Sequence, residues 1–228
     1  MRIEKFVFGP VGTNCYIVIN EMTSECFAVD MADCPQEFVK HIKDAGLCVK
    51  ALLLTHGHFD HIMGAERFAE IFGCPVYAYE GEENILCDPV LNASATMLGQ
   101  SYVFTKAEYV KADTQIETAG FQVEIIPTPG HTEGGCCYYI GEEHVLFSGD
   151  TLFHNSIGRT DLPTGSGSEL VRSVREKLLV LPEDTRVYPG QRGYPHVNEH
   201  RRSRSALRKG GGSRQAGPED RGGLCNGH

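Results

Sequence analysis

Hydrophobic positions in the first 55 residues follow strand and helix patterns in turn. Apolar runs at 15–19 and 26–30 flank a polar turn, which predicts a β-hairpin. Hydrophobic residues recur at helical spacing over 35–45 and stop at Gly46, so we expect a helix there. The run at 47–54 is apolar almost throughout, which is typical of a strand that is buried on both faces.

The same alternation continues up to about residue 190. A helix at 64–72 and a strand at 75–78 are predicted, whereas 80–105 has no clear pattern. Further strands are predicted at 121–126, 136–140, 144–148 and 185–188, and a further helix at 169–179. Hairpins come first and strand–helix alternation follows, which predicts an α/β (α+β) fold with mixed β-sheets and helices outside them.

Chain length and cysteine usage narrow the class of protein. At 228 residues the chain is long enough for one domain with a substantial core and short for two. The nine cysteines are scattered without a C-x-x-C pair, which favours buried residues in a reducing compartment over a disulfide framework or a cysteine-rich zinc site. The apolar run at 49–54 is far shorter than the roughly 20 residues that cross a bilayer, and the N-terminus has no signal-peptide pattern. We therefore expect a cytoplasmic protein without membrane association.

Charge divides the chain in two. Residues 191–228 hold eight Arg or Lys and three acids, whereas residues 1–190 hold 13 bases and 27 acids. The acidic part is a poor surface for a phosphate backbone, so no nucleic-acid partner is expected. The basic part is rich in glycine and lacks periodicity, which favours a disordered tail over a nucleic-acid-binding arm. We therefore predict one folded domain at 1–190 and a tail at 191–228.

Four potential metal ligands lie within six residues, directly after the strand predicted at 47–54. They are His56, His58, Asp60 and His61. His56 and His58 project to the same side of an extended segment. Asp60 and His61 follow where the chain turns into a helix. Imidazole and carboxylate groups bind Zn²⁺, Fe²⁺ or Mn²⁺, so this group predicts a metal site rather than a chance run of surface histidines.

Two later strand ends carry further potential ligands. His131 follows the strand predicted at 121–126, and Asp150 follows the strand predicted at 144–148. Taken singly, His131 is explained as a loop histidine and Asp150 as a turn cap. All three segments share one pattern, a buried strand that ends in a polar ligand beside glycine. Together they predict one cleft at one edge of the sheets.

The order and separation of these motifs resemble the metallo-β-lactamase superfamily. The resemblance covers about residues 1–190 and rests on His56-x-His58-x-Asp60-His61, Gly130-His131-Thr132 and Ser148-Gly149-Asp150-Thr151. Within the superfamily, Ser156-Ile157-Gly158-Arg159-Thr160-Asp161-Leu162-Pro163 is similar to small single-domain glyoxalase II-like (hydroxyacylglutathione hydrolase-like) enzymes. The resemblance implies an αββα four-layer sandwich of two mixed β-sheets flanked by helices, with metals at one edge.

The resemblance also implies a role for each of these side chains. The first metal ion would be bound by His56, His58 and His131, the second by Asp60 and His61, and Asp150 would bridge the two. Zn²⁺ is the expected cofactor, with two ions per chain, and Fe²⁺ or Mn²⁺ are alternatives. Metal-bound hydroxide would attack an acyl carbon, and Asp60 would be the catalytic residue that orients or deprotonates it. The expected substrate is a small-molecule thioester such as S-lactoylglutathione or a related acyl-thiol.

The chain departs from the family pattern after the last predicted strand. The family has a histidine after Pro-Gly that completes the second metal site, whereas Pro189 and Gly190 are followed here by Gln191. Glutamine is a weak neutral ligand, and His196 is the nearest candidate to replace the missing imidazole. Residues 196–202 look like a displaced trace of the family's last helix. A frameshift near codon 191 explains both departures, and resequencing of the coding DNA would test it.

Other interpretations compete with thioester hydrolysis. One alternative is a mononuclear Fe²⁺ persulfide dioxygenase, which the superfamily also contains; the resemblance at 158–161 extends partly to those enzymes and does not discriminate between the two. A degenerate member that binds metal weakly is favoured by Gln191. A β-lactamase is less favoured because no export signal is present, and the chain has no room for the insert domain of nuclease members. The sequence indicates nothing about the oligomeric state.

Overall fold

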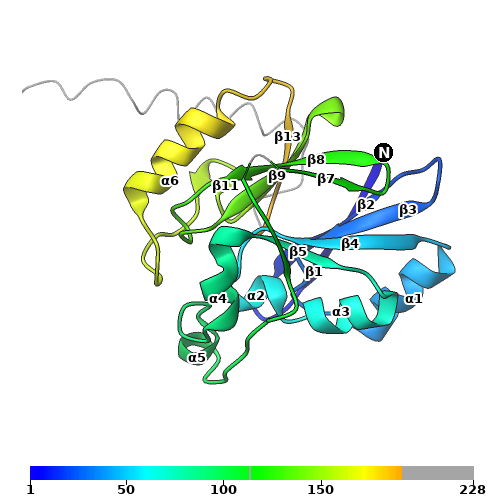
Figure 1. Ribbon diagram of the computed structural model, residues 1–228, viewed down its shortest axis with the longest axis horizontal. Helices are drawn as coiled ribbons and strands as arrows, with labels where there is room; N and C mark the ends of the chain where they lie inside the picture. Colours follow the sequence, from blue (N-terminus) through cyan, green and yellow to red (C-terminus); the bar gives the residue numbers. More distant parts are fainter. Residues whose placement is uncertain (113, 192–228) are drawn as a thin grey trace, which may run out of the picture.

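Two β-sheets pack face to face, and helices cover their outer faces (Figure 1). The computed structural model describes residues 1–112 and 114–191. These four layers confirm the predicted αββα sandwich of two mixed sheets. The tail predicted from residue 191 onward lies outside the described residues, apart from Gln191 itself.

The first sheet has six strands that adjoin one another in chain order. They are β1 (Arg2–Phe8), β2 (Thr13–Ile19), β3 (Glu25–Val29), β4 (Cys48–Leu54), β5 (Val76–Tyr79) and β6 (Glu108–Val110). The first three are antiparallel, which confirms the predicted hairpin, and β3 to β6 are parallel. Because parallel strands place their carboxyl ends at the same edge of a sheet, the loops after β3, β4 and β5 gather there.

The second sheet has five strands in the order β13-β10-β9-β8-β7. They are β7 (Gln115–Thr118), β8 (Phe121–Pro127), β9 (Cys136–Ile140), β10 (Val145–Gly149) and β13 (Arg186–Pro189). Neighbours are antiparallel except β10 and β13. A separate ribbon pairs β11 (Leu152–Phe153) with β12 (Ser156–Ile157). The hydrophobic pattern did not indicate β6, β7 or this ribbon, whose strands have two to four residues each.

Helices cover each sheet on its outer side (Figure 1). The helices α1 (Gln36–Asp44), α2 (Phe59–Ile62) and α3 (Ala65–Phe72) lie on the first sheet. Residues 80–105, for which the sequence showed no clear pattern, contain η1 (Glu80–Glu82), α4 (Glu83–Cys87) and α5 (Ser94–Met97). The second sheet carries α6 (Gly167–Ser173) and the π-helical turn η3 (Val174–Leu178), while η2 (Gly141–Glu143) joins β9 to β10. The helix predicted at 169–179 is therefore two segments. Leu178, which ends the π turn, and Leu179, which follows it, both lie in the core of that layer.

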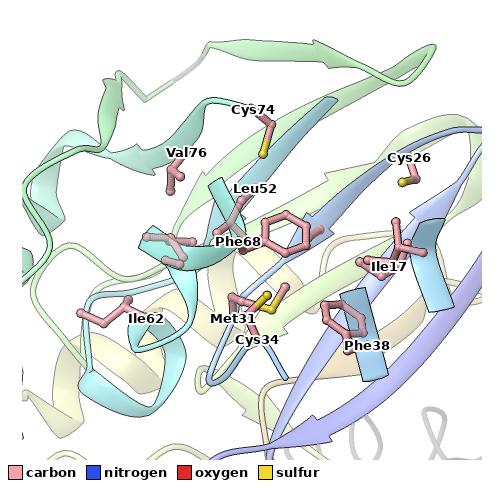
Figure 2. Packing of buried hydrophobic residues seen from close by; sticks show 14 of the residues in the cluster. Ile17, Cys26, Met31, Cys34, Phe38, Leu52, Ile62, Phe68, Cys74 and Val76 are labelled. Atoms are coloured by element: carbon pink, nitrogen blue, oxygen red, sulfur yellow. The ribbon is translucent and has the colours of Figure 1, made fainter. Parts of the chain in front are cut away.

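Successive residues of the central strands face two different cores. Ile17 on β2 and Leu52 on β4 pack with Phe68 between the first sheet and its helices (Figure 2). Their neighbours in sequence, Tyr16 and Leu53, pack between the two sheets. Because side chains alternate across a strand, an unbroken apolar run fits the middle of a four-layer structure.

The burial of β4 increases along the strand. Cys48 and Lys50 are exposed, so the expected burial on both faces holds only from Ala51 to Leu54. The buried half leads directly into Thr55. The strand end that carries the histidine motif is therefore fixed between the helices on one side and the second sheet on the other.

The described residues also give the state of the cysteines and the character of the helices. All eight described cysteines are free, and six of them are buried. Within residues 1–112 and 114–191, no helix has the length and apolar character that a membrane span requires.

Candidate metal centre

The loop after β4 starts on a buried carboxylate. Asp30, directly after β3, accepts hydrogen bonds from the Thr55 backbone N–H at Oδ1 (2.8 Å) and from the Thr55 hydroxyl at Oδ2 (2.8 Å). Asp30 has a φ of 54°, a left-handed conformation that aspartate tolerates better than most residues. These bonds fix the direction in which the chain leaves β4. As a result, His56 and His58 are buried at the edge of the sheet.

His131 and Asp150 reach the same edge from the second sheet. A Cβ at Gly149, where φ is +47°, would lie 2.4 Å from Thr55 Oγ1, so glycine lets the end of β10 approach the end of β4. A Cβ at Gly130, where φ is +137°, would lie 2.2 Å from a backbone nitrogen of α6. Both glycines directly precede a predicted ligand. The three strand ends therefore meet, as their shared pattern predicts.

Five of the predicted side chains form two adjoining groups of ligand-type atoms. The first donor group is His56, His58 and His131, and the second donor group is His56, His61 and Asp150. Within each group these atoms all lie within 4.8 Å of one another. His58 Nδ1 lies 2.9 Å from His131 Nε2 in the first group, and His61 Nε2 lies 3.4 Å from Asp150 Oδ1 in the second. Because His56 belongs to both, the two groups share one side chain.

Oxygen atoms outside the groups fix the orientation of two imidazoles. His61 Nδ1 lies 2.8 Å from Asp30 Oδ2, and His131 Nδ1 lies 2.8 Å from the Arg159 carbonyl oxygen. Both oxygens are acceptors, so each Nδ1 carries a proton and donates it. The Nε2 atom of a neutral His61 or His131 then has a lone pair available for a metal ion, which is the usual arrangement of histidine ligands.

His56 is oriented in the same way. The Thr55 hydroxyl gives its proton to Asp30, so its oxygen, 3.1 Å from His56 Nδ1, accepts the proton of that ring nitrogen. Among the described residues, His56 Nε2 and Asp150 Oδ1 have no hydrogen-bond partner although both are buried. Buried polar atoms are normally satisfied, and a metal ion satisfies lone pairs of this kind. The donor atoms therefore fit a metal.

The electrostatics of the two groups differ. Burial lowers the pKa of His58 to about 3 and lowers the pKa of His56 well below its usual value, and the neighbouring imidazoles add to both effects. Both side chains are therefore neutral at pH 7, as metal ligands must be. Burial also acts to lower the pKa of His61, but three carboxylates, led by Asp30, outweigh it and raise that pKa. Negative charge around His61 attracts a divalent cation, which would displace the Nε2 proton.

Asp60 lies beside the second donor group without belonging to it. Its Oδ2 atom accepts hydrogen bonds from the Thr13 hydroxyl (2.9 Å) and from the Gln191 side-chain amide (2.9 Å), and it lies 3.6 Å from His61 Nε2. Gln191, which stands in the sequence where the family has a histidine, therefore lies beside the second donor group. It presents an N–H donor to Asp60. His196, the other candidate for that place, lies outside the described residues.

Residues outside the predicted ligand set hold the ligands in place. Asp30 shares their signal, since it is a polar residue directly after a buried apolar run at 26–29. Arg159 belongs to the glyoxalase II-like segment, and its backbone carbonyl orients His131 while its guanidinium pairs with Asp161 (2.7 and 2.9 Å). That segment therefore supports the ligand geometry directly.

Comparison with known proteins decides the family. The sequence profile of the Metallo-beta-lactamase superfamily matches residues 9–190. This chain belongs to that superfamily. The resemblance seen in the three motifs is thereby confirmed.

Relatives in the superfamily extend over most of the chain. "Probable metallo-hydrolase YqgX" of Bacillus subtilis is 36% identical over 191 residues, which cover 83% of this chain and 90% of YqgX. "Hydroxyacylglutathione hydrolase GloC" of Haemophilus influenzae is 30% identical over 210 residues, which cover 91% of this chain and 98% of GloC. The similarity therefore includes whole proteins rather than one shared motif.

Two solved structures of the superfamily are similar in fold and in sequence. The BLEG-1 B3 metallo-beta-lactamase has a TM-score of 0.83 and 34% identity, and the match covers 90% of this chain and 99% of that one. TTHA1623 in a di-iron-bound form has a TM-score of 0.73 and 30% identity, with coverage of 88% and 98%. The whole described fold is thus that of a superfamily member.

Proposed function

We propose that this chain is a metallo-hydrolase that cleaves a small-molecule thioester, such as S-lactoylglutathione or a related acyl-thiol. The observation that carries the proposal is the pair of donor groups that share His56 and contain buried, unsatisfied ligand atoms. Two adjacent metal ions are suited to hydrolysis, because together they activate water and stabilise the charge that develops on an acyl oxygen.

We assign one metal ion to His56, His58 and His131 and a second ion to Asp60 and His61. The position of Asp150 supports a bridging role between them. Its Oδ1 atom lies 3.4 Å from His61 Nε2, while its Oδ2 atom lies 3.7 Å from His131 Nε2. Zn²⁺ is the ion we expect at both positions. Fe²⁺ or Mn²⁺ are alternatives, and iron is supported by the di-iron form of TTHA1623.

The side chains around the ions have distinct tasks in this proposal. A divalent ion lowers the pKa of a coordinated water and polarises an acyl carbonyl. Asp60 is the carboxylate that receives or holds the proton of the attacking water, since the Thr13 hydroxyl and the Gln191 amide fix its direction. Both Asp60 and Asp150 are more than nine-tenths buried, which strengthens their electrostatic effect on bound groups.

The choice of a thioester rests on the relatives. GloC carries the name hydroxyacylglutathione hydrolase, and YqgX carries the name probable metallo-hydrolase. The segment at 156–163, which resembles glyoxalase II-like enzymes, orients His131 through the Arg159 carbonyl. A cytoplasmic location would suit a thioester substrate, and it remains part of the proposal.

A β-lactam is the second candidate substrate. The BLEG-1 enzyme, a B3 metallo-beta-lactamase by name, is 34% identical and covers 90% of this chain. Thioesters and β-lactams both present an acyl carbon to the attacking water, so the donor groups suit either. The two differ in the leaving group, a thiolate or a ring amine.

One set of assays on the full chain separates these activities. The purified protein, prepared without added metal, is analysed by metal mass spectrometry and then assayed with S-lactoylglutathione, a chromogenic cephalosporin and a persulfide in an oxygen electrode. We expect metal in the preparation and turnover of the thioester above that of the cephalosporin. Bound iron together with oxygen uptake on the persulfide would contradict the proposal and indicate a dioxygenase instead. Low metal content in a folded, inactive protein would replace it with a degenerate member.

A further inference from the structure

Glu82 is a buried carboxylate that lies behind the first donor group. It ends η1, the short helix after β5, and its side chain has no exposed surface. A carboxylate in such a place is costly unless several hydrogen bonds satisfy it. Its sequence neighbourhood, within 80–105, shows no hydrophobic pattern that explains the burial. Its partners must therefore be sought in other parts of the fold.

The two oxygens of Glu82 bind two different ligand loops. Oε2 accepts a hydrogen bond from the Gly57 backbone N–H (2.7 Å), and Oε1 accepts one from the Thr132 hydroxyl. Gly57 stands between His56 and His58, and Thr132 directly follows His131. One side chain thus connects the loop from the first sheet with the loop from the second.

The backbone around Glu82 packs against the same two loops. A Cβ at Gly134 would lie 2.0 Å from the Gly81 carbonyl carbon. A Cβ at Gly57 would lie 2.9 Å from Ile85 Cγ2. Both loops therefore touch the 81–85 segment without space for a side chain between them. This close packing, together with the hydrogen bonds of Glu82, fixes the separation of the two loops.

We propose that Glu82 is a positioning residue that clamps the His56–His58 loop to the His131 loop and so sets the spacing of the first donor group. The proposal rests on the metal centre proposed above. In the structure, His58 Nδ1 and His131 Nε2 come from the two clamped loops and lie 2.9 Å apart. Glu82 acts through backbone and hydroxyl donors rather than by contact with the metal.

The alternative is that Glu82 only accepts hydrogen bonds from two loops that would keep the same positions without it. Burial raises the pKa of Glu82 to about 7, against the opposing effects of the Thr132 hydroxyl and the Gly57 amide. The ionised form is therefore destabilised by its surroundings. A buried carboxylate with a perturbed pKa beside a ligand cluster is therefore a candidate for a functional role.

Three variants of the full chain test the clamp. Glu82→Ala removes it, Thr132→Val removes one arm while keeping the branched shape, and Glu82→Gln keeps an oxygen for Gly57 and an N–H for the Thr132 hydroxyl. The matched control is Glu83→Ala, which removes an exposed carboxylate from the next position. The measurements are the Zn²⁺ affinity against a competing chelator and the visible ligand-field spectrum of the Co²⁺-loaded protein. The thermal midpoint of the metal-free protein reports whether each variant folds.

We expect Glu82→Ala to weaken binding of the first Zn²⁺ ion by about 10- to 100-fold, the usual effect of removing a partner that orients ligands. Thr132→Val should give a smaller loss and a shifted Co²⁺ spectrum, Glu82→Gln should recover most of the affinity, and Glu83→Ala should match the wild type. A folded Glu82→Ala protein with wild-type affinity and spectrum would overturn the clamp. So would a Glu82→Gln protein as weak as Glu82→Ala, because charge rather than position would then matter.

Two further results keep the test decisive. If Glu82→Ala does not fold, Thr132→Val alone decides, and unchanged Zn²⁺ affinity and Co²⁺ spectrum in that variant would overturn the clamp. The clamp and the proposed function also fail separately. A wild-type protein that binds zinc through a Glu82-dependent site but hydrolyses no thioester supports the clamp and refutes the function. Thioester turnover with unchanged zinc affinity in folded Glu82→Ala supports the function and refutes the clamp.

Discussion

The two sides of the metal centre are built from different chemistry. The first donor group consists only of imidazoles, and burial keeps His56 and His58 neutral. The second side collects carboxylates around His61, and Gln191 stands where a further imidazole is expected. Neutral nitrogen ligands favour tight binding of zinc, whereas a carboxylate-rich site with one imidazole fewer depends more on charge. We infer that one cleft holds a strong and a weak metal position.

The two sides also differ in how the fold supports them. Glu82 joins the loops of the first group from behind. On the second side, the Asn14 backbone N–H donates to the Gly190 carbonyl (2.7 Å), and the Gly190 N–H donates to the Gly149 carbonyl (2.8 Å). Gln191 is thus held at the metal edge by backbone bonds that do not depend on its side chain. In the proposed metal centre this position would suit a ligand, and glutamine is a weak one.

The largest effect is expected from the first group. His58→Ala and His131→Ala should each remove the first ion and abolish most turnover. Four-ligand zinc sites bind with about 10–16 kcal/mol, so one ligand accounts for roughly 3 kcal/mol and its loss weakens binding by at least about 100-fold. Metal mass spectrometry and initial rates on a thioester measure both quantities.

His41→Ala is the control for those variants, because His41 is an exposed histidine on α1 that pairs with Glu4 and packs against Phe6, away from the donor groups. It should leave metal content and rate unchanged. Wild-type metal and turnover in either His58→Ala or His131→Ala would remove that residue from the proposed ligand set.

A smaller effect is expected from the second side. His61→Ala should reduce the metal content from two ions to one and lower turnover less than His58→Ala does, because the first group stays complete. In the wild type, a chelator titration should remove the same ion first. Loss of both ions at once, in the variant or in the titration, would show that the two metal positions form one cooperative site. The inference of one strong and one weak metal position would then be wrong.

The sequence was most informative where a ligand lies within four residues after the end of a strand. His56, His131 and Asp150 all stand at such places, and the structure brings them together. Asp30 obeys the same rule and was open to the same inference. Local patterns reveal these residues because strand ends and ligands are adjacent along the chain.

Glu82 could not be found in this way. Its partners, Gly57 and Thr132, are 25 and 50 residues away in sequence, and one of them offers only a backbone N–H. The short strands β6 and β7 were also missed, because a run of three or four residues gives only a weak hydrophobic period. Contacts of this kind depend on the assembled layers rather than on any local pattern.

A third, more moderate effect is expected from a glycine on the second side. A Cβ at Gly190 would lie 2.5 Å from Asp150 Oδ1 and 2.6 Å from His61 Cε1. Gly190→Ala should therefore displace both side chains and weaken the second ion by about tenfold, within the range for disturbed ligand orientation. Gly141→Ala is the control, because a Cβ there meets only Tyr139 Cε1 at 3.6 Å. Unchanged affinity for the second ion in Gly190→Ala would show that binding of this ion does not depend on the positions of Asp150 and His61.

The smallest effect, and the one that tests the comparison most directly, is a gain. Gln191→His should raise occupancy of the second position and increase thioester turnover a few-fold, because imidazole binds Zn²⁺ more strongly than a carboxamide does. Gln191→Ala is the matched control, since it removes the hydrogen bond from the side-chain amide to Asp60 without adding a ligand. Arg192 follows in the sequence, and a positive charge on the residue after a new metal ligand works against binding of a divalent cation. The double variant Gln191→His with Arg192→Gly is therefore the cleaner test. If the double variant gains neither metal nor rate, a wild-type count near two ions would mean that the second site is already complete. A count near one, especially of iron, would favour the dioxygenase.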